Sequence, residues 1–344
     1  MAPVPSSSRP CLLAPRPTSD EDAIHTPQSM PLDEVRAQLE ALKHLEMQYR
    51  PQDYMDRSSV GSDCCDSYRV SIVEYLYRMV DLGKFSRNTV AYAVSNIMDR
   101  YLSLPSNHLI LLDQDKYEMV ALTSLFVASK LLEGKNIGVD TLVSLADGDY
   151  TEQDFVNLEQ SILTSLQWKV GHGPTALSFV ELYLQFLPKD SCPILKRSML
   201  NHVKYQLELA VPDYDLMIHN KPSELALAAI YNALEGVDST LIPPHKQKLF
   251  CSTLLNILCH VDGSCMSYDF KDRISKIQLD IQHLLYRVIC YVRDKETASR
   301  ARPQEETRGG SQDAESTTNI EKPNHISSGD RSTSGSPVTV VQES

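Results

Sequence analysis

The stretch from Tyr117 to Gly134 has the strongest hydrophobic pattern in the chain, and the other segments are best understood around it. Its apolar residues fall on nearly every side of a projected helix, which is typical of a helix surrounded by other helices. Gly134 stands where a helix C-cap is expected. Lys130, in the last turn, breaks the pattern, because a lysine is rarely buried without a partner. It either extends to solvent or is held ready for another protein.

Helical spacing of apolar residues predicts several more helices around this one. An amphipathic helix is expected within residues 31–48, followed by a polar loop at 57–66. The next predicted helices cover residues 68–80, 88–104, 116–132, 139–146 and 152–167. Strand-like alternation is weak throughout. We therefore expect one all-α domain built around residues 116–132.

The pattern then begins again after a Gly- and Pro-containing linker at residues 171–174. Further helices are predicted over residues 176–187, 193–210, 223–235, 246–258 and 271–293. Pro222–Gly236 is again apolar all round and ends in Leu-Glu-Gly, as does Tyr117–Gly134. This recurrence suggests an internal duplication. The predicted fold is all-α, with two tandem five-helix domains.

The domain boundaries follow from changes in composition. We expect a disordered tail at residues 1–30, a helix and loop at 31–66, a first domain at 67–170 and a second at 171–294. Residues 295–344 are rich in Ser, Thr, Pro and Glu and are predicted to be a disordered tail.

Composition argues against several classes of function. The 344 residues carry 33 Lys and Arg against 45 Asp and Glu, a net charge of -12, which disfavours nucleic-acid binding. No apolar run approaches the roughly 20 residues that a membrane span needs. The eight cysteines form no Cys-x-x-Cys pair, so neither a metal site nor a disulfide framework is predicted. Since no catalytic or cofactor-binding motif is visible either, we expect a protein that is not an enzyme.

Four short segments, in order, resemble the successive signatures of a cyclin box. They are Arg69–Tyr75, Ile97–Ser103, Ala128–Glu133, and Tyr150-Thr151 with Leu158-Glu159. The resemblance covers about residues 48–187, and a weaker second box covers about 175–293. It implies the double five-helix fold and a cyclin-dependent kinase as the binding partner.

The resemblance also implies roles for two charged pairs. Arg69 and Asp99 match a pair that bridges the first two helices in cyclins. Lys130 and Glu159 match the two residues by which cyclins hold the regulatory helix of their kinase. An ammonium and a carboxylate suit that task, because they bind backbone carbonyl and N–H groups.

The resemblance implies two further groups of site residues. Met119 and Leu131 match residues near the kinase contact. A docking patch for substrates or inhibitors of the kinase is expected on the first helix, at Tyr68, Ser71, Ile72 and Tyr75. Ser71 stands where an aliphatic residue is usual, so we expect an altered docking preference. Asn232 takes the place of Lys130 in the second box, so only the first should bind kinase.

The leading hypothesis is a regulatory subunit of a cyclin-dependent kinase in cell-cycle control. The family further implies residence in the nucleus and also in the cytoplasm. One alternative is a cyclin-like protein of transcription or nutrient signalling. Another is a transcription-factor-IIB-like DNA-binding protein, which shares the double fold but would need a basic face and a zinc ribbon.

Overall fold

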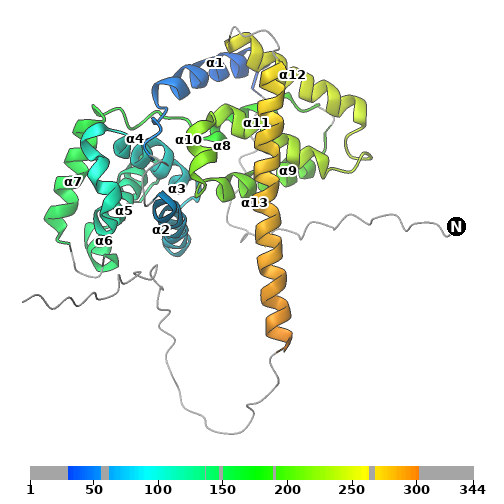
Figure 1. The fold of residues 1–344 in the computed structure, drawn as a ribbon. Helices are drawn as coiled ribbons and strands as arrows, with labels where there is room; N and C mark the ends of the chain where they lie inside the picture. Colours follow the sequence, from blue (N-terminus) through cyan, green and yellow to red (C-terminus); the bar gives the residue numbers. More distant parts are fainter. Residues whose placement is uncertain are drawn as a thin grey trace, which may run out of the picture. The chain divides into compact units, whose positions relative to one another are not determined.

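The structure is a computed structural model that describes residues 30–55, 62–135, 137–146, 150–188, 191–262 and 268–301. Within these ranges the regular elements are all helices (Figure 1). They form two successive groups, each packed around one central helix. This confirms the prediction of an all-α fold with two tandem domains. The predicted tails lie mostly outside the described residues.

In the first domain the other helices surround α5 (Gln114–Leu132). Most of α5 is buried, as its all-round apolar pattern predicts. The surrounding elements are α2 (Ser62–Gly83), α3 (Asn88–Tyr92), the π-helix η1 (Ala93–Met98), α4 (Asp99–Leu102), the 3₁₀ segment η2 (Pro105–Leu112), α6 (Val139–Leu145) and α7 (Glu152–Ser165). Helix α2 begins at Ser62, so the loop predicted at residues 57–66 is wrong over its last five positions.

In the second domain α11 (Pro222–Glu235) is the central helix. It packs against α8 (Ala176–Tyr183), α9 (Pro193–Ala210) and α13 (Tyr268–Ala301), and the domain is completed by η3 (Leu184–Phe186), α10 (Tyr214–His219) and α12 (Pro244–Asp262). Two features differ from the prediction. The six-residue α10 was not predicted, and α13 continues to Ala301, past the expected boundary at residue 294.

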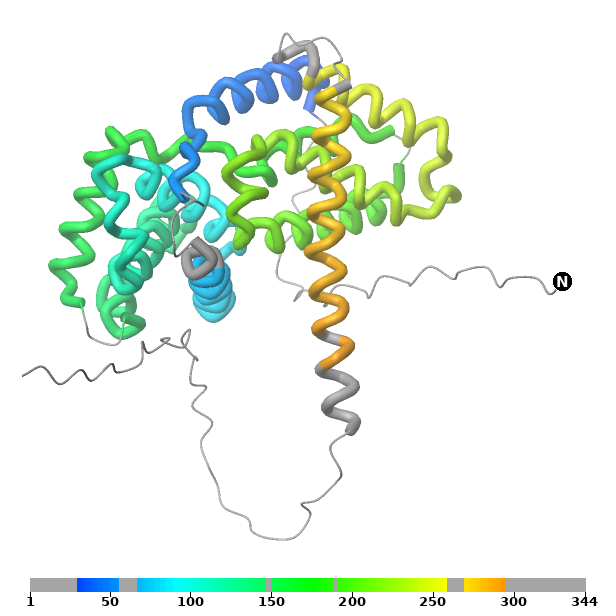
Figure 2. The backbone as a smooth tube through the Cα atoms, viewed as in Figure 1, coloured from blue at the N-terminus to red at the C-terminus, as the bar shows by residue number. Residues whose placement is uncertain are grey.

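Each domain takes part of its core from outside its own stretch of sequence. Helix α1 (Leu32–Gln48) precedes the first domain, yet its Val35 and Leu39 are buried in the core of the second. Conversely, Tyr214 and Ile218 of α10 are buried in the core of the first domain. Figure 2 shows α1, in blue, lying alongside the helices of the second domain. These crossed contacts tie the two domains together.

Two buried charges fix α1 to the second domain. The Nζ atom of Lys43 donates to the carbonyl of Leu258 at 3.0 Å. The carboxylate of Glu46 accepts hydrogen bonds from the backbone N–H of Ser223 at 3.0 Å and from its hydroxyl at 2.9 Å. Burial raises the pKa of Glu46, and the hydrogen bonds from Ser223 partly oppose that rise. Because Ser223 lies in the first turn of α11, Glu46 satisfies one of the N–H groups that a helix leaves free there.

Gly173, in the linker between the domains, is a point of close approach. A Cβ atom at this position would clash with the amide oxygen of Asn96 and would lie 2.6 Å from the Tyr49 ring. A Cβ atom at Gly171, two residues earlier, would meet nothing within 4 Å. Glycine is therefore required at only one of the two positions.

We predict that Gly173→Ala destabilises the protein by about 1–3 kcal/mol, because the methyl group overpacks a filled site. Gly171→Ala is the matched control and should stay within about 0.5 kcal/mol of the wild type. Urea unfolding followed by circular dichroism measures both. Equal stability of the two variants would contradict the prediction, because it would show that the backbone can shift at Gly173 to accommodate the methyl group.

Candidate functional site

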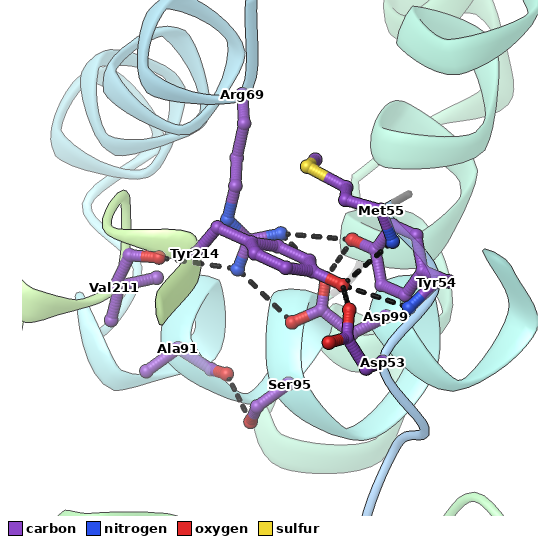
Figure 3. Close-up of polar contacts among 9 residues, drawn as sticks. All are labelled: Asp53, Tyr54, Met55, Arg69, Ala91, Ser95, Asp99, Val211 and Tyr214. Carbon is purple, nitrogen blue, oxygen red and sulfur yellow. Dashed lines mark hydrogen bonds and ion pairs between the residues drawn. The ribbon is translucent and has the colours of Figure 1, made fainter. Parts of the chain in front are cut away.

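A buried ion pair joins the first two helical stretches of the first domain (Figure 3). The guanidinium of Arg69, on α2, donates to both carboxylate oxygens of Asp99, the first residue of α4, at 2.5 and 3.0 Å. Both side chains are fully buried. Such bidentate pairing is the geometry in which Arg and a carboxylate interact most strongly.

The residues around this pair come from two other parts of the chain. The Tyr54 hydroxyl donates to Asp99 at 2.8 Å and accepts from Arg69 at 3.2 Å. Arg69 also donates to the carbonyl of Val211 at 3.3 Å and lies 5.7 Å from the centre of the Tyr214 ring. The pair therefore connects the segment after α1, the first domain and the start of α10 in the second.

The electrostatics of the pair follow from its burial. Burial alone would lower the pKa of Arg69, but Asp99, Tyr54 and Tyr117 together outweigh it and hold that pKa above its usual range. Burial, together with Asp99, raises the pKa of the Tyr54 hydroxyl. The guanidinium is thus charged and the phenol neutral at physiological pH.

A second charged pair lies at the surface of the same domain. The Nζ atom of Lys130, at the end of α5, donates to the carboxylate oxygens of Glu159, on α7, at 2.7 and 2.9 Å. It also lies 3.7 Å from the centre of the Phe126 ring. The side chains keep 34% and 19% of their exposure. Because both side chains are partly open to water, solvent weakens the attraction between them, and groups of another protein could compete for it.

Large apolar side chains are exposed at the end of α5 and in the turn that follows α7. Leu131 and Leu132 follow Lys130 and are each 43% exposed. Trp168, nine residues after Glu159, is 69% exposed. Its φ angle is +58°, and that of Gln167 is +53°. Left-handed backbone is uncommon for residues other than glycine, and here it directly follows the C-terminal end of α7. Trp168, the chain's one tryptophan, was not among the predicted site residues.

The remaining residue named for the kinase contact is placed differently. Met119 is buried in the core of the first domain, near the start of α5. It lies eleven residues before Lys130, which is about 16 Å along a helix. Met119 therefore lies in the core and away from the Lys130–Glu159 pair, whereas Leu131 is exposed next to Lys130.

In the second domain, α13 covers Asn232, the residue that corresponds to Lys130. The side-chain amide of Asn232 donates to the carbonyl of Gln278 at 3.2 Å. Its oxygen accepts from the amides of Gln278 and Gln282 at 3.3 and 3.0 Å. Asn232 is thus committed to contacts within the chain, in contrast to the open Lys130–Glu159 pair.

The docking patch expected on the first helix cannot consist of all four named side chains. Ile72 and Tyr75 are buried in the core, so that part of the prediction is wrong. Both fall on the side of α2 that packs against the domain. Tyr68 and Ser71 are partly exposed, and the Tyr68 hydroxyl donates to the carbonyl of Gln114 at 3.1 Å.

A cleft of about 800 Å³ is lined by residues of both domains. Three of its charged lining residues pair with one another: Arg87 donates to Glu208 at 2.8 Å and to Asp81 at 2.6 Å. Among the described residues, no group of three or more His, Cys, Asp or Glu is placed to hold a metal ion. None of the described helices is long and apolar enough to cross a membrane.

Comparison with known families agrees with this geometry. The sequence model "Cyclin, N-terminal domain" matches residues 38–171, and "Cyclin, C-terminal domain" matches residues 174–287. The two matches fall on the two helical domains and together cover most of the chain, which identifies a cyclin-type protein. This chain belongs to the cyclin family.

Curated relatives and a solved structure point the same way. The chain is 30% identical to Cyclin-B1-1 of Arabidopsis thaliana over 191 residues, 56% of this chain and 41% of that protein. It is 26% identical to G2/mitotic-specific cyclin-B of Arbacia punctulata over 211 residues, 61% of this chain and 46% of that one. It therefore spans less than half the length of either relative. A viral cyclin from herpesvirus saimiri shares the fold, with a TM-score of 0.53, 16% identity, and coverage of 72% of this chain and 99% of that one.

We predict that Asp99→Ala destabilises the protein by about 3–5 kcal/mol, because it leaves the buried Arg69 charge without its partner. The double variant Arg69→Met/Asp99→Leu removes both charges and should be clearly less destabilised than Asp99→Ala. Urea unfolding measures the two differences. A double variant that is the less stable of the two would contradict the assignment of the cost to an unpaired buried charge.

Proposed function

We propose that this cyclin is a non-catalytic regulatory subunit that binds and activates a cyclin-dependent serine/threonine kinase in cell-cycle control. The observation that carries the proposal is the exposed Lys130–Glu159 pair beside exposed apolar side chains. Its relatives named as mitotic-specific cyclins support the cell-cycle part. The proposal includes residence in the nucleus, with a fraction in the cytoplasm. Imaging of a fluorescently tagged chain tests this localisation.

The chemistry of the pair suits recognition of a helix end or a loop. On binding, the Lys130 ammonium would donate to backbone carbonyls of the kinase, and the Glu159 carboxylate would accept from backbone N–H groups. Leu131 and Trp168 would supply the apolar area that such a contact needs. Backbone recognition of this kind depends little on the side chains of the partner.

Activation would follow from binding alone. Kinase catalysis requires the Glu of the regulatory helix to pair with the Lys that contacts ATP. A cyclin bound to that helix favours the inward position, in which the pair forms. The effect is a shift in population driven by the interface, and this chain supplies no catalytic group.

A transcription-factor-IIB-like role has little support from the electrostatics. The net charge is -12, whereas DNA binding depends on neutralising phosphates with Lys and Arg. A kinase partner outside cell division is the stronger alternative. Capture of a transcription-related kinase, in place of a division kinase, would favour it.

We predict that Lys130→Ala/Glu159→Ala weakens kinase binding at least tenfold, about 1.4 kcal/mol, while the protein stays folded. The fold should persist because the exposed pair adds little to stability. The measurement is capture of kinases from lysate, followed by phosphorylation of a histone peptide and circular dichroism of each variant.

Lys116→Ala is the matched control, since Lys116 is an exposed lysine in the first turn of α5. It should capture active kinase as the wild type does. If the double variant captures kinase equally well, the Lys130–Glu159 pair is not the contact. If the wild type captures none, the family assignment stands but the proposed partner does not.

We predict that Trp168→Ala also weakens kinase binding at least tenfold, because the exposed indole would be buried by the partner. Its stability should stay within about 0.5 kcal/mol of the wild type, since a surface side chain contributes little to folding. Titration calorimetry with the captured kinase, together with thermal unfolding, separates the two effects. Loss of stability with unchanged binding would assign Trp168 a purely structural role.

A further inference from the structure

Helix α13 carries an exposed stripe on the side that faces away from its own domain. Its inner side is buried through Ile274, Ile277 and Ile281, which pack in the core of the second domain. On the outer side, Leu279 is 54% exposed and Tyr286 is 64% exposed. Figure 1 shows the lower part of α13 extending past the other helices of the second domain. The apolar residues of the outer stripe have no cover within the part of the chain that the structure describes.

The stripe has a regular spacing and a charge at each end. Asp272, Leu279, Tyr286 and Arg293 occur at intervals of seven residues. Residues seven apart drift by only about 20° around a helix, so the four lie along one side. Asp272 and Arg293 are both exposed, and they lie about 31 Å apart along the axis. An acid thus stands at one end, a base at the other, and apolar residues between.

Such a stripe is complementary to itself when two copies run antiparallel. Asp272 of each copy then meets Arg293 of the other, and Leu279 meets Tyr286. A parallel pairing would instead put like charges together at both ends, which is unfavourable. Lys276, at the edge of the stripe, would face the turn at Ile289 and Cys290 of the other copy, clear of Arg293.

The position of the stripe also suits this arrangement. Since each domain lies on the inner side of its own α13, two copies can join through the outer sides without their domains meeting between the helices. His283, near the centre of the stripe, would lie close to the two-fold axis. An isologous pair of this kind is the commonest form of oligomer.

We propose that a second copy of this chain binds the outer stripe, forming an antiparallel dimer of α13 helices. A single pair of helices buries less than the standard interface of about 1,600 Å², so a weak and reversible dimer is expected. The proposed dimer forms through the second domain, whereas the Lys130–Glu159 pair lies on the first. The proposal therefore stands whether or not a kinase binds at that pair.

Exchange of the end charges tests the proposal on the full-length chain. Sedimentation equilibrium over about 1–100 µM should show a monomer–dimer equilibrium for the wild type. Asp272→Arg and Arg293→Asp should each weaken it at least tenfold, because like charges then meet at both ends. An equimolar mixture of the two variants should form a heterodimer, since opposite charges are restored across the interface.

Two further variants make the result specific. Tyr286→Glu should abolish the dimer, because it replaces one of the two apolar residues of the stripe with a charge. Arg287→Asp is the matched control: it makes the same change in charge as Arg293→Asp, but about 100° around the helix from Tyr286. It should dimerise as the wild type does. A wild type that is monomeric throughout, or a mixture that does not associate, overturns the proposal.

Discussion

The structure depends most on the buried ion pair between Arg69 and Asp99. A charge removed from water is tolerated only when its partner and hydrogen bonds are in place. Here those bonds require Tyr54 from the segment after α1, and the carbonyl of Val211 from the end of α9. The Arg69 guanidinium therefore links the position of α2 to that of α4. It also links the position of one domain to that of the other.

This link explains why the two charged pairs behave differently. The Arg69–Asp99 pair is fully buried, so the attraction between its two charges stabilises the packing of α2 with α4. The Lys130–Glu159 pair lies on the same domain but remains open to water. Because α5 and α7 are held by the core beneath, the open pair and the apolar side chains beside it form a preorganised surface. The second domain has no such surface at the equivalent place, where α13 covers Asn232.

Sequence reasoning succeeded where the pattern was long and regular. Helices α5 and α11 are apolar all round because each is surrounded, and this pattern alone predicts two helical domains. Helix α10 has only six residues, too few to show a helical period. The residues at the end of α13 have the polar composition expected of a disordered tail, because this part of the helix extends beyond the rest of its domain. The contact between Arg69 and Val211 joins residues 142 positions apart, which no local pattern reveals. Trp168 was not predicted as a site residue because neither its exposure nor its backbone conformation can be read from the sequence.

Hydrogen–deuterium exchange of the chain, alone and with its captured kinase, tests the central claim most directly. The account predicts new protection at the end of α5, around Lys130 to Leu132, and along α7 to Trp168. The equivalent end of α11 should be unchanged, because α13 already covers it. Protection confined to the second domain, with none on α5 and α7, would contradict the claim that the open charged pair is the kinase-binding surface.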